Sequence, residues 1–402
     1  MTLPTATQQP SPERLTVVLV AHHIHDHGGM ERAYYELIRR SATEIDFVVV
    51  ASELAEDLRP LAEWRRVAAP ARPAPLRVLA FFLTGSIGVA RARRALRRRG
   101  RGPVLVHVLG AVVAARADIA TLQFCHTAFV ADNHRLAPPN APLSRRLNTG
   151  LLRLIALVAE RWCFRPARVR LLAPVSTSTQ AEASRHFPTI PSSITPNGVD
   201  VERFRPDLVA RVAVRSELGT ADDALVAIFV GGDWDRKGLG EAITGVAAAR
   251  AATGTPFELW VVGDGDAQRF GRLAAAARIE GSVRFLGRQS ATERYYAAAD
   301  IFVLPTLYET FSLVAYEAAA TGLPIVATRV SGIDELLAGD GAGIAVERSA
   351  DQVAAALIRL AGDPQLRERY GAEGRHRAAA FDWSRSVEAV RELYRRLVTA
   401  GA

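Results

Sequence analysis

The stretch "PTLYETFSLVAYEAAATGLPIVAT", residues 305–328, contains the end of one strand, a helix and the strand that follows. After the first proline comes a short loop, and the pattern then predicts a helix over 312–320 that stops at Gly322 and Pro324. A strand, a helix and a second strand in this order indicate a parallel sheet covered by helices. A helix N-terminus at the carboxyl end of such a strand presents free N–H groups, which hold phosphates. The stretch therefore predicts an α/β fold with an anion site.

Apolar runs of strand length recur on both sides of this stretch. They are rich in Val and Ile and alternate with helical patterns such as 30–41, which is typical of parallel strands buried on both faces. The first set of runs covers 15–21, 46–51, 103–109, 119–125, 169–176 and 192–197. The second set covers 224–231, 257–263, 283–287, 301–305, 323–328 and 343–346. We therefore expect two α/β units in tandem.

The two sets of runs meet near residues 198–208, where Gly198 and Pro206 interrupt both periodicities. The C-terminal segment has one apolar stripe of an amphipathic helix, which could dock on either unit. The predicted parts are a disordered tail (1–14), an N-terminal domain (15–203), a C-terminal domain (204–380) and a terminal helix (381–402).

Composition indicates a soluble globular chain. Its 402 residues are 49% hydrophobic and 23% charged, which is enough material for two cores. Residues 1–200 hold 26 arginines against 15 acids, whereas residues 201–402 hold 24 basic residues against 27 acids. A basic half favours anionic partners, namely nucleic acid, an acidic lipid surface or a phosphorylated substrate. No nucleic-acid module is recognisable, so we expect no nucleic-acid partner.

Cysteine usage and the N-terminal sequence favour a cytoplasmic protein. Cys125 and Cys163 are too few for a disulfide framework, and no metal-binding Cys spacing appears. The opening "MTLPTATQQPSPER" lacks the basic and apolar regions of a secretory signal. The apolar run at 78–90 is shorter than a spanning helix needs, so we expect no transmembrane segment.

The interval from Trp64 to Ala117 contains twelve arginines and no acid. It includes "RARRALRRRGR" at 91–101, preceded by the apolar run "VLAFFLTGSIGVA". A helix of this composition could lie on an anionic membrane surface. The alternative is a solvated basic face. Peripheral contact with the inner face of a membrane, through residues 76–101, is therefore one expectation of the sequence.

Charged residues of the second unit are candidates for chemistry. Lys237, in the turn "GGDWDRKGLG" (231–240), is the only lysine in a chain with 49 arginines, which suggests a local role. Glu309 and Glu317 lie eight residues apart at the predicted anion site. Carboxylates repel phosphate, so these two are better suited to accept hydrogen bonds from hydroxyl groups. The alternative is that both glutamates lie on solvated surface.

Five motifs in one order resemble the retaining glycosyltransferases of family four, which have the GT-B fold. They are the E-x7-E pair, "PNGVDVERFRP" (196–206), "GGMER" (28–32), "VVGDGD" (261–266) and "DRKG" (235–238). The resemblance runs from about residue 15 to 400. It implies two facing Rossmann-like domains with a cleft between them. It also implies transfer of a sugar from a nucleotide diphosphate sugar, with UDP favoured, to a hydroxyl acceptor held mainly by the N-terminal domain, without metal or cofactor.

The resemblance also assigns roles in the second unit. Glu309 would contact hydroxyls of the donated sugar, and Glu317 would bind the ribose. Backbone N–H groups around 311–314 would hold the diphosphate, and Arg236 and Lys237 would stabilise the leaving group. One departure concerns Gly231 and Gly232, where many members have Gly-Arg; the adjacent basic pair could replace the missing arginine.

In the first unit, Gly28 and Gly29 would let the helix from Met30 approach a ligand closely. In the resembled family this turn faces the donor phosphates. His126 follows a predicted strand and would contact the donor sugar, although a structural histidine is the alternative. The loop also gathers His22, His23, His25 and His27 beside Asp26, but their spacing fits no standard metal site, and we expect no metal.

The complete prediction has two sets. The catalytic residues are His126, Arg236, Lys237 and Glu309. The donor-binding residues are Gly28, Gly29, Gly231, Gly232, Arg236, Lys237, Gly263, Arg284, Leu286, Glu309, Thr310, Phe311, Ser312, Leu313, Val314 and Glu317. Two alternatives stay open: a nucleotide-sugar 2-epimerase of the same fold, and a catalytically silent membrane-associated partner subunit. The sequence leaves the sugar, the base, the acceptor and the oligomeric state undetermined.

Overall fold

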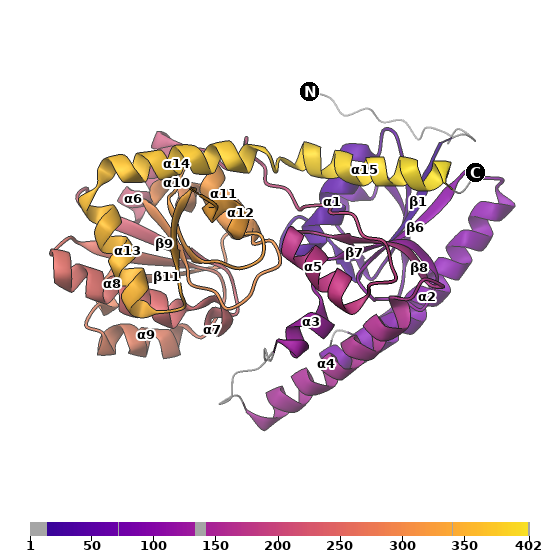
Figure 1. Ribbon diagram of the computed structural model, residues 1–402, viewed down its shortest axis with the longest axis horizontal. Coiled ribbons are helices and arrows are strands. Elements are labelled where there is room, and N and C mark those ends of the chain that lie inside the picture. Colours follow the sequence, from indigo (N-terminus) through magenta and orange to yellow (C-terminus); the bar gives the residue numbers. More distant parts are fainter. Residues whose placement is uncertain (1–13, 71, 133–141, 340, 401–402) are drawn as a thin grey trace. The chain divides into compact units, whose positions relative to one another are not determined.

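The computed structural model describes residues 14–70, 72–132, 142–339 and 341–400 (Figure 1). The predicted tail therefore lies almost wholly outside the described residues. The chain forms two compact units: unit 1 contains the residues up to Pro196 and those from Ser386 onward, and unit 2 is Asn197–Arg385.

The change from unit 1 to unit 2 comes a few residues before the expected boundary at 203. The reason is a set of contacts that ties this stretch to unit 2. The Val199 N–H donates to the Phe381 carbonyl (2.8 Å), and the Trp383 N–H donates to the Val199 carbonyl (3.3 Å). A side chain at Gly198 would lie 2.6 Å from the Trp383 ring, so only glycine allows this approach.

Unit 1 is built on a six-stranded parallel sheet of order β5-β3-β1-β6-β7-β8. The strands are β1 (Thr16–Val20), β3 (Asp46–Ala51), β5 (Ala62–Arg66), β6 (Val104–Leu109), β7 (Ala117–Leu122) and β8 (Val169–Pro174). The short strands β2 (His23–Ile24) and β4 (Glu53–Leu54) pair beside it. The helices are α1 (Met30–Ser41), α2 (Ala74–Arg98), α3 (His126–Ala131), α4 (Leu143–Cys163), α5 (Thr177–His186) and most of α15 (Trp383–Thr399), with the 3₁₀ turn η1 (Glu56–Leu58).

Unit 2 is built on a second six-stranded parallel sheet of order β11-β10-β9-β12-β13-β14. Its strands are β9 (Leu225–Val230), β10 (Phe257–Val262), β11 (Val283–Gly287), β12 (Ile301–Leu304), β13 (Ile325–Thr328) and β14 (Gly343–Val346). Its helices are α6 (Leu208–Leu218), α7 (Trp234–Lys237), α8 (Leu239–Thr253), α9 (Ala267–Ala276), α10 (Thr292–Ala298), α11 (Leu313–Ala320), α12 (Asp334–Leu337), α13 (Ala350–Gly362) and α14 (Pro364–Ala379), with the turn η2 (Glu280–Ser282).

Both sheets have the strand order of the doubly wound Rossmann fold. Counting strands of each sheet along the chain, the spatial order is 3-2-1-4-5-6 in unit 1 and again in unit 2. Helices cover both faces of each sheet, and β1 and β9 at the centres are almost fully buried (Figure 1). The prediction of two Rossmann-like α/β units is confirmed.

Two strand predictions differ from the structure. Residues 192–197 form no strand, and only Ser192 makes an isolated bridge, to Leu172. The Ser193 and Thr195 N–H groups donate to carbonyl groups of β8, but Pro196 has no N–H to continue this pairing. Conversely, β5 reads "AEWRR" and lacks an apolar run. It is the edge strand, paired only with β3, so its side chains meet solvent and need no apolar pattern.

The terminal helix α15 packs on unit 1 from Ser386 onward. Its Val387, Leu393 and Tyr394 are buried in the same apolar cluster as β1 and α1. The Tyr394 hydroxyl lies 2.6 Å from His107 Nδ1, and the other ring nitrogen lies 2.7 Å from Thr121 Oγ1. Burial lowers the pKa of His107 to about 3, so this ring is neutral near pH 7.

Candidate functional site

A cluster of polar side chains in unit 2 lies where the strand order of its sheet reverses, between β9 and β12. In doubly wound sheets this switch point opens a crevice at the carboxyl ends of the strands, where ligands bind. The turn after β9 carries Gly231 to Lys237, and the loop after β12 carries Pro305 to Glu309. Sequence segments some seventy residues apart thereby supply one site, since the Arg236 carbonyl accepts a hydrogen bond from the Leu307 N–H (2.9 Å).

Glycine shapes the turn after β9. Gly231 has φ of +134°, and a side chain there would lie 2.7 Å from Lys237 Cε. The absence of a side chain therefore lets the lysine lie across the backbone of the turn. Gly238 has φ of +82°, and a side chain there would lie 2.2 Å from the Pro305 carbonyl oxygen. Both glycines are needed for the turn to approach the end of β12 this closely.

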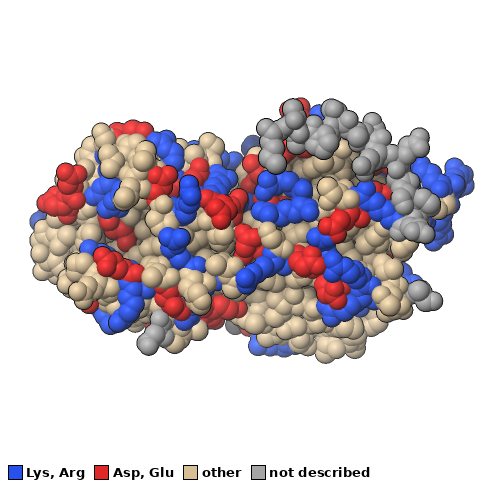
Figure 2. All heavy atoms as spheres, turned by 90° about the horizontal axis from the view of Figure 1, so that it is seen from above, with Lys and Arg blue, Asp and Glu red and all other residues tan. Residues whose placement is uncertain are grey.

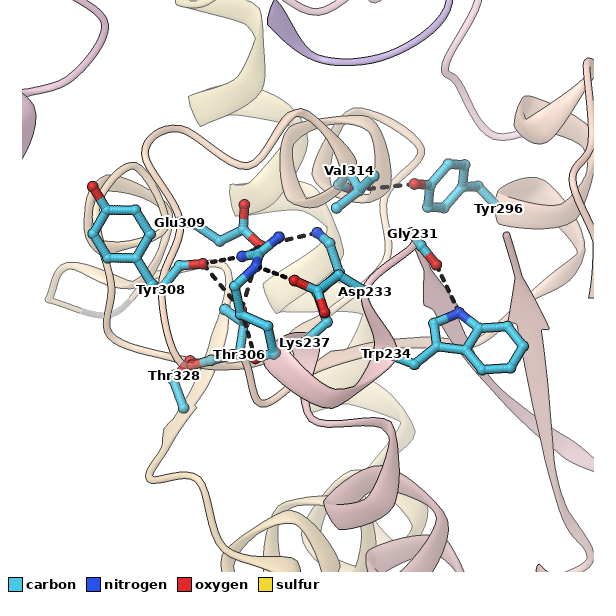
Figure 3. Close-up of polar contacts among 11 residues, drawn as sticks. Gly231, Asp233, Trp234, Lys237, Tyr296, Thr306, Tyr308, Glu309, Val314 and Thr328 are labelled. Carbon is cyan, nitrogen blue, oxygen red and sulfur yellow. Dashed lines mark hydrogen bonds and ion pairs between the residues drawn. The ribbon is translucent and has the colours of Figure 1, made fainter. Parts of the chain in front are cut away.

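Lys237 and Arg236 converge on one carboxylate oxygen of Glu309 (Figure 3). Lys237 Nζ lies 2.9 Å and Arg236 Nη1 3.3 Å from Glu309 Oε1. Arg236 also donates from Nε to Asp233 Oδ2 (2.9 Å) and from Nη1 to the Tyr308 carbonyl. The Lys237 and Glu309 side chains are each 11% exposed, so this charge pair is largely shielded from water. The structure brings together three of the four predicted catalytic residues.

The charge state of Glu309 follows from its neighbours. Burial by itself would raise the pKa of this carboxyl group, but the charges and hydrogen bonds of Lys237 and Arg236 outweigh burial, and the pKa lies below its ordinary value. Glu309 is therefore an anion at neutral pH. Because an ammonium has three N–H donors and a guanidinium five, the two cations keep donors for a further anion.

Two threonines support the cluster, and sequence analysis did not identify them. Thr306 is 1% exposed, and its Oγ1 lies 3.3 Å from both Glu309 Oε1 and the Tyr308 carbonyl oxygen. Thr328, at the end of β13, donates its hydroxyl to the Thr306 carbonyl (2.5 Å; Figure 3). The available signal was a hydroxyl residue at the end of each of two adjacent strands, where ligand-binding side chains collect.

Helix α11 has no carboxylate in its first turn. Its N-cap, Ser312, has the left-handed φ of +65°, one of three positive values among described residues other than glycine; a second is Asp233 in the same cluster. Ser312 Oγ is buried and has no hydrogen-bond partner within the described part of the chain. A strained backbone and an unpartnered buried hydroxyl at a helix N-terminus are features of an anion site. Phe311, Leu313 and Val314 contribute backbone to the same turn.

Glu317 lies in the second turn of α11 and is 8% exposed. The Tyr296 hydroxyl, from α10, lies 3.2 Å from the Val314 carbonyl oxygen (Figure 3). It also lies 3.2 Å from Glu317 Oε2, so it fixes this face of the helix. Tyr296 is another supporting residue that the sequence did not indicate, because it belongs to the preceding helix α10 and lies outside the motif. Thr310 is half-buried in the loop between the glutamate pair.

The remaining predicted residues of unit 2 divide into two groups. Gly263, with φ of +128°, lies against Gly231, where a side chain would meet the Gly231 carbonyl at 2.3 Å, and Gly232 is exposed in the same turn. Leu286 lies near the carboxyl end of β11. Arg284, in contrast, is near the start of β11, and its Nε donates to Glu258 at the start of β10 (2.8 Å). Arg284 is therefore not brought into the cluster.

In unit 1, His126 is the first residue of α3, and a buried carboxylate already occupies this helix N-terminus. Glu160, from α4, accepts the His126 N–H (2.7 Å) and the Thr127 N–H (2.8 Å). Burial raises the pKa of Glu160, although these hydrogen bonds lower it. Burial also lowers the pKa of His126 to about 4, which keeps its ring neutral near pH 7.

The glycine turn of unit 1 is exposed. Gly28 has φ of +93°, and α1 begins after Gly29 without a side-chain cap. In the histidine loop, His23 pairs with Glu53 (2.8 Å) and His27 with Asp26 (2.5 Å). In residues 14–70, 72–132, 142–339 and 341–400, no group of three or more His, Cys, Asp or Glu is arranged to hold a metal ion.

Two family models match the chain, one in each unit. The model described as "Glycosyltransferase Family 4" matches residues 27–203, and "Glycosyl transferases group 1" matches residues 224–363. Curated relatives include the D-inositol 3-phosphate glycosyltransferases of Streptomyces bingchenggensis and Kineococcus radiotolerans. The first is 32% identical over 56% of this chain and 52% of its own length, and the second is 29% identical over 72% and 69%. The chain thus spans about half the length of the first relative.

Solved structures share the fold across nearly the whole chain. WaaG, a glycosyltransferase involved in lipopolysaccharide biosynthesis, has a TM-score of 0.76 at 20% identity, over 94% of this chain and 99% of WaaG. HepE of Anabaena, in complex with UDP and glucose, has a TM-score of 0.67 at 15% identity, over 94% and 98%. The two family models follow the order of the two Rossmann-like units and between them match more than half of the chain. On this ground the chain belongs to the family 4 glycosyltransferases, which have the GT-B fold.

Proposed function

We propose that the chain is a retaining glycosyltransferase that moves a sugar from a UDP-sugar to a hydroxyl acceptor, with the donor bound by unit 2. The observation that carries this proposal is the convergence of Lys237 and Arg236 on Glu309 beside the α11 N-terminus. Cations and free backbone N–H groups suit a diphosphate, and a carboxylate among them suits sugar hydroxyls. The UDP and UDP-glucose held by HepE favour uridine nucleotides for this chain as well.

Different residues of unit 2 bind different parts of the donor. The α11 N-terminus, from Phe311 to Val314, holds the diphosphate through backbone N–H groups, and the Ser312 hydroxyl adds a donor. Lys237 and Arg236 oppose the negative charge that grows on the leaving phosphate, which is electrostatic stabilisation of a transition state. Glu309 accepts hydrogen bonds from the sugar, while Glu317 accepts them from the ribose. Gly231 and Gly263 leave room for the donor to approach the backbone.

The transfer breaks the bond between the anomeric carbon and the oxygen of the β-phosphate. The electron pair of that bond stays with the phosphate, whose added charge the two cations offset. The acceptor hydroxyl forms its bond from the same face that the phosphate leaves, and its proton passes to the departing phosphate oxygen. The anomeric configuration is retained, and no carboxylate nucleophile is needed.

We place three residues of unit 1, namely Gly28, Gly29 and His126, on the acceptor side of the site. Gly28 and Gly29 form an exposed glycine turn, and the neutral ring of His126 can exchange hydrogen bonds with a sugar hydroxyl without carrying charge. The acceptor itself is a hydroxyl compound. The comparisons favour neither a 2-epimerase nor a silent partner subunit, since the curated relatives and solved neighbours that we report are named as glycosyltransferases.

Two measurements on the full chain test the proposal. Calorimetric titration should show that UDP binds, that GDP binds more weakly, and that Lys237→Ala weakens binding of UDP. Slow hydrolysis of UDP-glucose, in which water takes the place of the acceptor, should release α-glucose first, as followed by proton NMR. Absence of binding by any nucleoside diphosphate would overturn the donor site, and initial release of β-glucose would overturn retention.

A further inference from the structure

Helix α4 exposes a stripe of large apolar side chains. Its exposed residues at intervals of three or four are Leu143, Leu147, Leu151, Leu154, Val158 and Trp162, each 42% to 68% exposed. This spacing puts them on one face of the helix. A helix on the surface of a soluble domain normally exposes mainly charged residues, whereas α4 exposes six large apolar residues beside Arg146 and Arg161. The single acid of α4, Glu160, is 2% exposed and bonded to α3, so it does not offset the stripe.

Helix α2 packs against α4 and repeats the pattern (Figure 1). Leu76, Leu79, Leu83 and Ile87 are 46% to 59% exposed in its first half, and Arg91, Arg94, Arg97 and Arg98 are exposed in its second half. By length and composition α2 is the one helix of the described residues that could cross a membrane. Its other face, however, contacts the sheet: a side chain at Gly88 would lie 2.8 Å from Val50. Since one face is committed to the core, α2 can lie on a bilayer with the other face.

Two hollows beside α2 are lined by arginine. One, of about 440 Å³, is lined by Val89, Ala90, Arg93, Arg94, Arg97, Ala115 and Arg116. The other, of about 360 Å³, is lined by Arg65, Arg66, Val67, Ala68, Thr84, Ile87, Gly88 and Arg91. No acid lines either hollow. Both volumes are of the size that holds a small ligand.

The first hollow carries uncompensated charge. Arg93 pairs with Asp118 at 3.7 Å, whereas Arg94, Arg97 and Arg116 form no ion pair within the residues that the structure describes. Burial lowers the pKa of Arg93, Asp118 raises it, and the like charges of Arg97 and Arg116 lower it further. An anion in this hollow would relieve that repulsion.

The C-terminal end of the α4 stripe combines an aromatic ring with cations. The guanidinium groups of Arg165 and Arg168 lie 5.4 and 4.3 Å from the centre of the Trp162 ring. Tryptophan flanked by arginine is typical of side chains at the boundary between lipid headgroups and acyl chains. On the face of the molecule drawn in Figure 2, in contrast, basic and acidic side chains are interspersed.

We infer that α2 and α4 form a docking surface for a bilayer that contains anionic phospholipids, here called the α2–α4 surface. The two apolar stripes enter the boundary of headgroups and acyl chains, and the arginine hollows hold the lipid phosphates. This surface is independent of the donor site in unit 2. The charge of this surface favours a bilayer over a second copy of the chain as its partner. Two copies would bring two arginine-rich segments without acids together, and these would repel each other, whereas anionic lipids would neutralise the arginines.

Flotation of the full chain with lipid vesicles tests this proposal without any use of activity. The chain should float with vesicles of phosphatidylcholine and phosphatidylglycerol in equal parts and should not float with phosphatidylcholine alone. High salt should reduce flotation because the arginine contribution is screened. Inorganic phosphate at the concentration of the lipid phosphate should not release the chain, because free phosphate supplies no apolar phase.

Paired variants identify the surface. The double variant Leu147→Glu/Leu154→Glu should weaken vesicle binding at least about tenfold, since each glutamate must enter the headgroup boundary. Its matched control is Val209→Glu/Val212→Glu on α6, where two exposed apolar residues of unit 2 are replaced, and binding should not change. Arg94→Gln/Arg97→Gln should weaken binding to anionic vesicles about thirtyfold, and Arg272→Gln/Arg369→Gln, exposed arginines of unit 2, should not.

Thermal melting of each variant separates loss of binding from loss of fold, because all the replaced side chains are exposed. Three outcomes would overturn the proposal. The first is that the chain does not float with anionic vesicles. The second is that both double variants of unit 1 float as well as the unchanged chain. Sedimentation could instead show a dimer that the α4 variant separates, which would assign the apolar stripe to a second copy.

Discussion

The helix N-termini of α3 in unit 1 and α11 in unit 2 differ in what compensates their positive partial charge. Both follow a strand of a doubly wound sheet and leave N–H groups without intrahelical partners. At α3, the chain's own Glu160 accepts two of them, at 2.7 and 2.8 Å. At α11, no acid lies in the first turn, and the buried Ser312 hydroxyl has no partner among the described residues.

The difference agrees with our proposal that unit 2, rather than unit 1, binds the anionic part of the donor. A helix end that holds an internal carboxylate has its positive charge offset, and a diphosphate there would meet repulsion. The loop before α11 carries Glu309 instead, and this carboxylate is paired with two cations, Lys237 and Arg236. The α3 N-terminus is thus bonded to a carboxylate of the chain, whereas the Ser312 hydroxyl at the α11 N-terminus has no partner among the described residues.

Acidification should separate the two units most strongly. Burial lowers the pKa of His22 and His126 to about 4 and of His107 to about 3, all in unit 1. The unfolded chain takes up these protons near pH 6.5, so unit 1 loses stability as the pH falls below that value. Glu160 has a raised pKa, so its protonation stabilises unit 1 as the pH falls, but three histidines act in the opposite sense. At pH 5 the three histidines together should lower the stability of unit 1 by about 5–6 kcal/mol relative to pH 7, and Glu160 makes this loss smaller.

Unit 2 should lose stability only at a lower pH than unit 1. Glu258 and Glu309 have lowered pKa values, so their contribution is present above about pH 4.5 and is lost only as the pH falls through the folded values. Amide hydrogen exchange at pH 5, corrected for intrinsic rates and compared with pH 7, should show lost protection in unit 1 first. The control is His107→Gln, which should reduce the pH dependence of unit 1. Simultaneous loss in both units would contradict this account.

Replacement of Lys237 should affect catalysis more than any other single change in unit 2. Lys237→Ala should lower turnover about 10²- to 10³-fold, because a charge that stabilises the leaving phosphate is removed. Arg236 remains 3.3 Å from Glu309, so the carboxylate keeps a partner and the fold persists. Release of UDP from UDP-glucose measures the rate. The matched control is Arg288→Ala, whose side chain is 78% exposed, and wild-type turnover in Lys237→Ala would remove this lysine from the mechanism.

Gly231→Ala tests the turn rather than the charge. The new methyl group would lie 2.7 Å from Lys237 Cε, and φ of +134° strains any residue with a side chain. We expect a loss of stability of about 1–3 kcal/mol together with a loss of turnover, because the lysine must move. Calorimetric melting and the UDP-release assay measure the two effects. Gly254→Ala, which also has positive φ but open space around it, controls for strain and should keep turnover.

Ser312→Ala should have the smallest effect. Alanine keeps the side-chain carbon at φ of +65° and removes only the unpartnered hydroxyl, so stability should stay the same or rise slightly. Loss of one donor to the diphosphate should weaken UDP binding about fivefold by calorimetry. Unchanged affinity would show that this hydroxyl does not face the ligand.

Sequence patterns identified the sheets better than the contacts of the site. The apolar strands of both sheets could be predicted because parallel strands buried on both faces must be apolar, and the edge strand β5 could not because it is not buried. The cluster of Lys237, Arg236 and Glu309 was found from its motif. Thr306 and Tyr296 were not, since their roles depend on which strands and helices become neighbours in space. Arg284 is the opposite case: it was predicted to bind the donor but lies at the start of β11, away from the carboxyl end where the cluster forms.

The most direct test of the central claim is amide hydrogen exchange of the full chain with and without saturating UDP. The account predicts that UDP protects the backbone around 311–314 and the turn 231–237 in unit 2, while the start of α3, already held by Glu160, does not change. Protection confined to unit 1, or none in the α11 turn when UDP is bound, would contradict it.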